Sequence, residues 1–312
     1  MSALRLTLAC WDYDRTRALI DGRVQPEGID LVYLIQPVEE TFFRMMRYRE
    51  FDCSEMSLSS YVASLNSESP PFIAIPVFPS PDELKGRRVG VPEYQMTAPV
   101  WIRGILSDDY GVKVTDVEHL SGGEEEPGRD EKLKLDLPPQ IRLRPIGPSQ
   151  TLSRMIADGE IDALVTARAP STFHREPDKV RRLFEQYVEI EKFYYRRTKI
   201  FPIMHTVVVR RDVYAKNPWV AQSLYKAFVA AKQIAYDLYN QTAAMPAMLP
   251  WLTAHLDEAK RELGEDWWPY GLEPNRHVLD TFLRYHHEQG LSKRRFKTEE
   301  LFARETLAAY KV

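Results

Sequence analysis

The hydrophobic positions in the first quarter of the chain change repeatedly between a strand period and a helix period. Apolar runs predict strands over 4–9, 29–35 and 51–56, and apolar residues at helical spacing predict helices over 15–21 and 38–48. The stretch LSSYVASL then continues the order with another helix. This alternation indicates an α/β fold with parallel strands, whose ligand site lies beyond the carboxyl ends of the strands.

The stretch 89–104, VGVPEYQMTAPVWIRG, predicts a strand that leads into the N-terminus of a helix. Its apolar run breaks at Pro92, and a helical pattern resumes a few residues later. Tyr94, Gln95 and Thr97 lie at this junction, beside the unpaired backbone N–H groups of the first helical turn. The junction therefore predicts an anion site, most simply one for a carboxylate.

The remaining pattern predicts two lobes. Strands are expected over 141–144 and 161–165. Between them, Leu152, Met155 and Ile156 form one face of a predicted helix, which ends at Gly159. The chain then returns with a strand over 205–210 and a long amphipathic helix over 219–238. The C-terminal quarter is expected to be helical. The proline-rich stretch 70–86 is typical of a crossing between lobes, which gives lobe I as 1–80 plus 204–312 and lobe II as 81–203.

Composition limits the function classes. The chain has 312 residues, 44% of them hydrophobic, enough for a substantial core and two lobes. Its net charge of −3 gives no support for nucleic-acid or membrane-surface binding. No segment has the length of a membrane span, and the N-terminal apolar stretch is too short for a signal peptide, so we expect a cytoplasmic protein. Cys10 and Cys53 fit a reducing compartment, as small buried hydrophobes.

Polar side chains lie at five predicted strand ends, all of which would face one cleft. They are Trp11, Asp12, Tyr13, Asp14 and Arg15; Glu55, Ser57 and Ser59; Tyr94, Gln95 and Thr97; Thr166 and Arg168; and His205 and Thr206. Asp12 and Ser57 fit helix capping as well as ligand contact. His205 lies among apolar residues, where desolvation favours the neutral ring, and it fits either a catalytic group or a core histidine bonded to a carbonyl.

Arginines strengthen the anion prediction. Arg15, Arg103 and Arg168 lie within or near the predicted strand-end loops, and a guanidinium binds a carboxylate through two hydrogen bonds. Arg103 fits a solvated helix position equally well. Flat apolar walls would come from Trp11, Tyr13, Tyr61 and Tyr94. Together with the cations, these walls suit an aromatic diacid.

The sequence does not predict a metal site. His286 and His287 occupy adjacent helical positions that do not face each other, so they do not form a ligand pair. The stretch VGVPEYQ lacks the lysine and second glycine of a phosphate loop.

Several strings resemble the 4,5-dihydroxyphthalate decarboxylase family over nearly the whole chain. They are YDRTRALIDGRVQPEGIDL, MMRYREFDCSEMSLSSYVASL, LKGRRVGVPEYQMTAPVWIRGIL, GEIDALVTARAP, FPIMHTVVVRRDVY, NPWVAQSLYKAF and WWPYGLEPNR. The resemblance implies a two-lobed fold like that of type II periplasmic binding proteins, with an interlobe cleft. It also implies a lyase that needs no organic cofactor and converts 4,5-dihydroxyphthalate to 3,4-dihydroxybenzoate. The family pattern has about twenty further residues where Ser80 here runs directly into Pro81.

The decarboxylation chemistry suggests roles for the candidate residues. His205 would be the acid or proton shuttle, and Glu55 or Asp12 would receive the phenol proton. Arg168 and the turn 94–97 would hold the retained carboxylate of an aromatic dicarboxylate substrate. The rival functions are a solute-binding protein for an aromatic acid and a related lyase acting on another carboxylated ring. Trp251, Trp267 and Trp268 fit either a subunit contact in a homo-oligomer or core packing.

Overall fold

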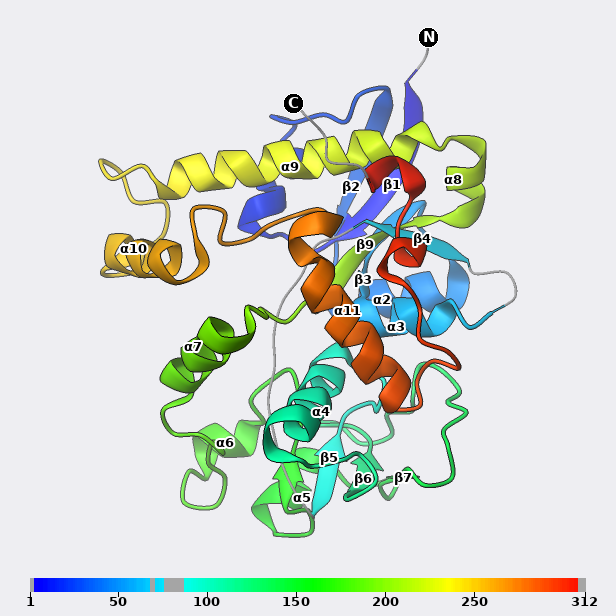
Figure 1. Cartoon of the computed structure of the whole chain (residues 1–312), viewed down its shortest axis with the longest axis vertical. Helices are drawn as coiled ribbons and strands as arrows, with labels where there is room; N and C mark the ends of the chain where they lie inside the picture. The colour runs from blue at the N-terminus through cyan, green and yellow to red at the C-terminus, as the bar shows by residue number, and fades with distance from the viewer. Residues whose placement is uncertain (1–2, 68–70, 76–86, 308–312) are drawn as a thin grey trace.

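The computed structural model describes residues 3–67, 71–75 and 87–307 and contains two β-sheets, each in its own half of the molecule (Figure 1). The first sheet has the strand order β2-β1-β3-β9-β4. Its strands are β1 (Leu4–Cys10), β2 (Ile29–Ile35), β3 (Cys53–Ser57), β4 (Phe72–Ile75) and β9 (His205–Arg210). The second sheet has the order β7-β6-β5-β8. Its strands are β5 (Arg88–Val91), β6 (Glu118–Ser121), β7 (Arg142–Pro145) and β8 (Ala163–Leu164).

Helices connect and cover these strands. The first half holds α1 (Arg17–Ile20), α2 (Val38–Tyr48), α3 (Leu58–Ser64), α8 (Arg211–Lys216) and α9 (Trp219–Tyr239). The second half holds α4 (Thr97–Tyr110), α5 (Leu152–Ala157) and α6 (Ser171–Arg175). The remaining helices, α7 (Tyr187–Thr198), α10 (Leu252–Leu263) and α11 (Leu272–Glu288), flank the two halves. Short 3-10 turns lie at Asp14–Thr16, Thr298–Leu301 and Arg304–Thr306.

Most predicted elements are present. The helix over 38–48 and the strands over 29–35 and 205–210 have the predicted bounds, and 89–104 holds β5 and the start of α4. The strand predicted over 161–165 is shorter, because only Ala163–Leu164 pairs with β5. The chain after α11 is mostly turns rather than helix.

The expectation of uniformly parallel strands was wrong for the first sheet. β1 runs parallel to β2 and β3, but β9 is antiparallel to both β3 and β4. The reason is topological. The chain passes through the second half before β9 enters this sheet, and β9 then inserts between β3 and β4 from the opposite direction. The second sheet is parallel throughout.

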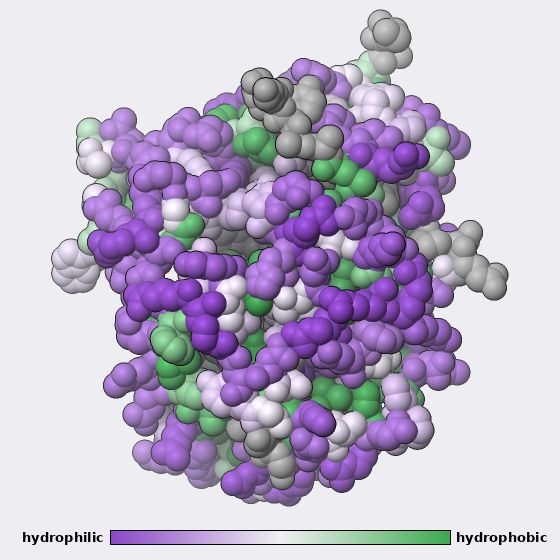
Figure 2. All heavy atoms as spheres, viewed as in Figure 1, coloured by the Kyte–Doolittle hydropathy of each residue, from purple (hydrophilic) through white to green (hydrophobic). Residues whose placement is uncertain are grey.

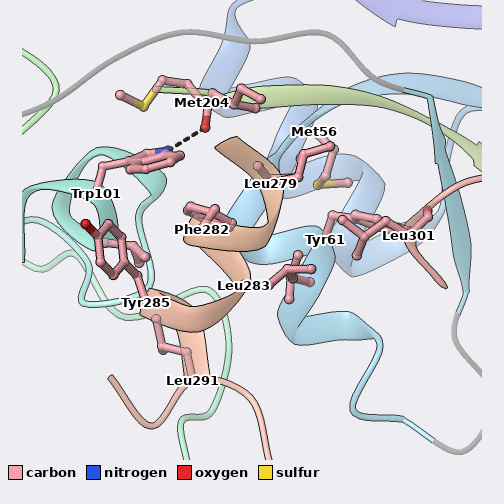
Figure 3. Packing of buried hydrophobic residues seen from close by; sticks show 14 of the residues in the cluster. Met56, Tyr61, Trp101, Met204, Leu279, Phe282, Leu283, Tyr285, Leu291 and Leu301 are labelled. Atoms are coloured by element: carbon pink, nitrogen blue, oxygen red, sulfur yellow. Dashed lines mark hydrogen bonds between the residues drawn. The ribbon is translucent and has the colours of Figure 1, made fainter. Parts of the chain in front are cut away.

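One core cluster runs through both halves. Figure 3 shows α11 packed between Trp101 of α4 and Tyr61 of α3, with Phe282 and Tyr285 facing Trp101. The Trp101 indole N–H donates to the carbonyl of Ile203 at 2.8 Å. The lobe division 1–80 plus 204–312 against 81–203 stays a prediction. The junction of Ser80 with Pro81 lies outside the described residues.

The contact between α4 and α11 depends on a glycine. A Cβ atom at Gly104 would lie 2.1 Å from the buried ring of Tyr285, well inside van der Waals contact. Only the absence of a side chain allows the two helices this spacing. Among the described residues, no helix is both long and apolar enough to cross a membrane.

Candidate active site

Neighbouring strands of the first sheet bring three chemically active side chains onto one face. Because side chains alternate along a strand, Cys10 at the end of β1 and Glu55 on β3 point the same way as Leu8 and Cys53, which pair directly. His205 begins β9 and pairs with Ser57, which is two residues after Glu55 on β3. The sheet register thus places a thiol, a carboxylate and an imidazole side by side at the edge where β3 ends.

Glu55 is the centre of this cluster and is 3% exposed. Its Oε1 atom accepts hydrogen bonds from the Tyr13 hydroxyl at 2.6 Å and lies 2.8 Å from Nδ1 of His205. Its Oε2 atom accepts from the backbone N–H of Trp11 at 3.4 Å and lies 3.7 Å from the Cys10 thiol. A buried carboxylate with this many donors satisfies its hydrogen-bonding capacity without water.

These partners keep Glu55 ionised. Burial would raise the pKa of its carboxyl group, but the hydrogen bond and charge of His205, with the hydrogen bonds from Tyr13 and Trp11, hold that pKa below its usual range. The pKa of the Tyr13 phenol is raised far above its ordinary value, because the group is buried beside the Glu55 charge. Tyr13 therefore serves Glu55 as a hydrogen-bond donor.

His205 is oriented by Glu55 and not by a carbonyl, so the core-histidine alternative gave the wrong partner for Nδ1. Phe42 packs edge-on against the imidazole, with ring centres 5.0 Å apart. The side chain keeps 26% of its surface exposed. No hydrogen bond to Nε2 is found among the described residues, so this nitrogen is the one able to exchange a proton with a ligand.

The loop after β1 places two more predicted residues beside this group. Trp11 is 43% exposed, and its carbonyl accepts from the Tyr33 hydroxyl at 2.9 Å. Asp12 does not cap a helix; both of its oxygens accept from Arg17, at 2.7 and 2.9 Å. The guanidinium of Arg15 lies over the Tyr13 ring, 3.8 Å from its centre.

The predicted residues Ser57 and Thr97 join the two halves at the N-termini of α3 and α4. Ser57 caps α3 by accepting from the Ser60 N–H, which confirms the capping alternative, and its hydroxyl also lies 2.9 Å from the Thr97 hydroxyl. The Ser60 hydroxyl donates to the side-chain oxygen of Gln95 at 3.0 Å. The polar groups at this junction are thus paired with each other, and Gln95 and Thr97 are buried.

Tyr94 and Arg103 are also buried, and both contact Gln289, which directly follows α11. The Tyr94 hydroxyl donates to the carbonyl of Gln289 at 3.1 Å. Arg103 donates to the Gln289 side chain at 2.8 Å and to the carbonyl of Tyr94 at 2.6 Å, and its guanidinium lies 4.0 Å from the Tyr94 ring centre. Both side chains have protein partners for their polar groups in this arrangement. The alternative prediction of a solvated helix position for Arg103 was wrong, because its side chain is buried.

The side chain of Arg168 is 71% exposed. Its guanidinium is 3.8 Å from Glu39 on α2, and Arg129 reaches the same Glu39 at 3.6 Å. Arg129 also binds the buried Glu93. These ion pairs connect the second half to α2.

The described residues contain no group of three or more His, Cys, Asp or Glu side chains placed to hold a metal ion. His286 is buried, with contacts to the Ser292 hydroxyl at 3.1 Å and the Ser59 carbonyl at 3.2 Å. Burial lowers its pKa to about 3. His287 contacts the Ser292 carbonyl at 2.9 Å, so each histidine has its own structural partners.

A large apolar groove of about 680 Å³ lies elsewhere, between the end of α4, α7 and α10. Figure 2 shows hydrophobic residues at the surface over α7, and no residue of this helix is buried. The groove contains none of the predicted catalytic residues.

Sequence reasoning missed Cys10, Tyr33 and Phe42 as neighbours of the site. Cys10 directly precedes the strand-end loop, so its position could have indicated a contact with Glu55. Tyr33 and Phe42 come from β2 and α2. No local motif marks them, because only the pairing of β2 with β1 and the packing of α2 bring them close.

Two curated relatives are similar to this chain, although no family model matches it. The chain is 42% identical to 4,5-dihydroxyphthalate decarboxylase from Comamonas testosteroni over 330 aligned positions, which cover all of both chains. It is also 42% identical to 4,5-dihydroxyphthalate decarboxylase from Pseudomonas putida over 202 residues, which cover 59% of this chain and 78% of that relative.

Solved structures show the fold. The periplasmic aliphatic sulphonate binding protein SsuA from Escherichia coli is similar with a TM-score of 0.52 at 13% identity, over 98% of this chain and 99% of that one. A periplasmic sulfonate-binding protein from Methylobacillus flagellatus is similar with a TM-score of 0.50 at 13% identity, over 97% and 92% of the two chains. The expected periplasmic-binding-protein-like α/β fold is therefore confirmed.

Proposed function

The chain belongs to the 4,5-dihydroxyphthalate decarboxylase family, and from this we propose that it converts 4,5-dihydroxyphthalate to 3,4-dihydroxybenzoate and carbon dioxide. The observation that carries the proposal is the 42% identity that extends over the full length of both chains. The contact of buried Glu55 with partly exposed His205 supports it, because a proton donor to carbon is what this reaction demands.

The reaction follows from the positions of the substituents. Each carboxylate of 4,5-dihydroxyphthalate lies para to a hydroxyl group. When a base removes the phenol proton, electrons move from that oxygen into the ring, and the carboxylate-bearing carbon takes a proton from an acid. The bond to the carboxylate then breaks, its electron pair restores aromaticity, and carbon dioxide leaves. The phenol oxygen regains a proton, so one proton is consumed overall.

His205 is the proposed proton donor to carbon. Glu55 accepts a hydrogen bond from Nδ1–H and stabilises the protonated ring, which leaves Nε2 to deliver the proton. The phenol proton goes to Glu55 or to Asp12. The lowered pKa of Glu55 disfavours it as a proton acceptor, whereas both oxygens of Asp12 are paired with Arg17. Asp12→Asn distinguishes the two acceptors: it should lower kcat if Asp12 accepts the phenol proton and leave kcat unchanged if Glu55 does.

Incubation of the purified protein with 4,5-dihydroxyphthalate tests the proposal, with carbon dioxide and 3,4-dihydroxybenzoate measured together. We expect stoichiometric formation of both products. Binding of the compound without turnover would contradict the decarboxylase proposal and would favour the solute-binding alternative. Turnover of another carboxylated ring, but not of this one, would show a related lyase instead.

Two broader features are also proposals. Free, buried Cys10 and Cys53 support a reducing compartment such as the cytoplasm. The hydrophobic residues exposed over α7, together with Trp251, which is 78% exposed, support a homo-oligomer. Light scattering coupled to size-exclusion chromatography tests the second point, since a monomer mass at micromolar concentration would contradict it.

A further inference from the structure

Arg15 lies in a cluster of aromatic side chains that come from distant parts of the chain. Its guanidinium carbon is 3.8 Å from the Tyr13 ring centre and 5.2 Å from that of Trp268. Tyr270, two residues further on, is 7% exposed and packs in the same core cluster. The positive charge of Arg15 acts on its phenol group. The segment between α10 and α11 thus closes one side of the Arg15 environment.

This cluster has hydrogen-bond donors without acceptors. In the part of the chain that the structure describes, Nε of Arg15, Nε1 of Trp268 and the hydroxyl of Tyr270 are buried and have no hydrogen-bond partner. The first two groups only donate. The Arg15 side chain interacts with the Tyr270 oxygen, but the Tyr270 proton and the Trp268 indole N–H still lack an acceptor. Buried donors are normally paired, so three together indicate that an acceptor belongs here.

The charge of the cluster indicates what kind of acceptor fits. The ion pair of Arg15 is a distant contact with Asp14, whose half-exposed carboxylate lies 3.9 Å away and also accepts from the Tyr239 hydroxyl. Glu55 is already committed to Tyr13 and His205. The Arg15 guanidinium thus has no close carboxylate partner, and an anionic oxygen acceptor such as a carboxylate would pair with it and with the unpaired donors.

The two aromatic side chains are held in place before any ligand binds. Lys232 of α9 is 6% exposed and donates to the Trp268 carbonyl at 3.0 Å and to Asp266 at 2.6 Å. The Tyr236 hydroxyl accepts from the backbone N–H of Trp268 at 2.8 Å. The segment that carries Trp268 and Tyr270 is thus fixed to a long helix, and a preorganised site of this kind loses little entropy on binding.

The cluster of Arg15, Trp268 and Tyr270 is connected to Glu55 and His205 through Tyr13. Tyr13 separates the two: Arg15 lies on the face of its ring, and its hydroxyl binds Glu55, which orients His205. The ring of Tyr13 and the carboxylate of Glu55 therefore connect Arg15 to the proposed proton donor, His205. We propose that Arg15, Trp268 and Tyr270 form the subsite that binds the carboxylate which the substrate retains. This inference rests on the proposed decarboxylase function.

Conservative variants test the subsite with the full-length protein. Tyr270→Phe and Trp268→Phe each remove a donor but keep an aromatic ring, and Arg15→Met keeps the packing of the arginine stem. We expect each to weaken the binding of 3,4-dihydroxybenzoate, measured by calorimetry, by about tenfold, with a larger loss for Arg15→Met. For 4,5-dihydroxyphthalate, KM should rise by a similar factor while kcat changes less.

The controls separate a ligand contact from a structural role. Catechol, which lacks a carboxylate, should bind the wild type and the three variants equally, whereas general damage to the site would weaken both ligands. Trp251→Phe, at an exposed tryptophan, should bind both ligands as the wild type does. Wild-type affinity for 3,4-dihydroxybenzoate in all three variants would overturn the subsite.

The outcome for the subsite is independent of the outcome for the reaction. Calorimetry needs no turnover, so a protein that binds the dicarboxylate through Arg15 without decarboxylating it would retain the subsite and lose the proposed function. A protein that decarboxylates 4,5-dihydroxyphthalate with unchanged KM in all three variants would retain the function and lose the subsite.

Discussion

Oε1 of Glu55 lies 2.8 Å from Nδ1 of His205, on two antiparallel strands whose residues are 150 positions apart in the sequence. The pair exists because β9 returns from the second half of the molecule and inserts next to β3. A carboxylate that fixes one imidazole nitrogen leaves the other with a defined direction and proton affinity. This relationship is the basis of the first two predictions.

Removing either member of the pair should stop the chemistry and leave binding intact. His205→Asn removes the proposed proton donor, and Glu55→Gln removes the charge that stabilises its protonated form. We expect kcat for 4,5-dihydroxyphthalate to fall by about 10²–10⁴-fold in each, with Kd for 3,4-dihydroxybenzoate within a few fold of the wild type. Steady-state kinetics and calorimetry measure the two quantities.

Glu50→Gln is a matched control, because Glu50 is exposed and pairs with Arg44 away from the site. It should keep the wild-type kcat. A wild-type rate in His205→Asn would remove His205 from the mechanism.

Tyr13→Phe should shift the pH dependence of the reaction. The Tyr13 hydroxyl donates to Glu55 and is one of the groups that lower the pKa of Glu55. Its loss should raise that pKa, so Glu55 becomes protonated at a higher pH as the solution is acidified. The acidic limb of the kcat/KM profile should therefore move to higher pH. Kinetics across the range from pH 4 to 8 measure this shift.

A matching tyrosine provides the control. The Tyr214 hydroxyl donates to Glu305 at 2.6 Å, the same distance as the Tyr13–Glu55 bond, but in another part of the molecule. Tyr214→Phe should leave the acidic limb unchanged. An equal shift in both variants would show a general effect on stability and would contradict the role of Tyr13.

The periodicity of the sequence was sufficient to predict most elements of the fold. Strands such as β2 and helices such as α2 have strong local patterns, and their bounds were correct. The direction of β9 was not predictable from its own residues, because an antiparallel and a parallel central strand carry the same apolar pattern. Only the path of the chain through the second sheet decides it.

The candidate site was predictable only in part, for a similar reason. Glu55 and His205 could be identified as polar residues at strand ends, and the structure brings them together. Tyr94 and Arg103 show the same local signal, yet Gln289, which directly follows α11, supplies their partners. Gln289 is nearly two hundred residues away in sequence, so no local pattern reveals it. Trp268 and Tyr270 are still further from Arg15 in the sequence.

Gly104→Ala should destabilise the protein although alanine favours helices. The new methyl group would meet the Tyr285 ring, which is buried and cannot move without displacing α11. Overpacking of this kind costs about 1–3 kcal/mol of the free energy of unfolding, more than the roughly 1 kcal/mol gained in helix propensity. Urea denaturation measures the net effect.

Tyr285→Leu in the Gly104→Ala background tests the cause, because a smaller side chain gives the methyl group room. The double variant should lose less stability than the sum of the two single losses, by at least about 0.5 kcal/mol. Additive losses would show that the ring of Tyr285 does not limit the α4–α11 spacing.

Glu131 should make stability depend on pH near neutrality. One oxygen accepts from the Tyr94 N–H at 2.6 Å, and the other is buried without a partner among the described residues. Burial, with the charge of Glu93 acting in the same direction, outweighs that hydrogen bond and raises the pKa of Glu131 to about 7. The native state therefore keeps this proton at pH values where the unfolded chain has lost it. The resulting stability is fully present below the unfolded pKa and is lost as the pH rises to about 7.

Glu131→Gln removes this titration and keeps a neutral oxygen to accept from Tyr94. The variant should gain about 1–3 kcal/mol in the free energy of unfolding relative to the wild type when the pH is raised from 5.5 to 8. Urea denaturation at the two pH values measures the change. Glu126→Gln, at an exposed glutamate of the same loop, should show no such difference. If Glu131→Gln differs from the wild type by the same amount at both pH values, Glu131 does not titrate in this range, and its carboxylate is tolerated in the buried site because the surrounding donors and cations compensate its charge.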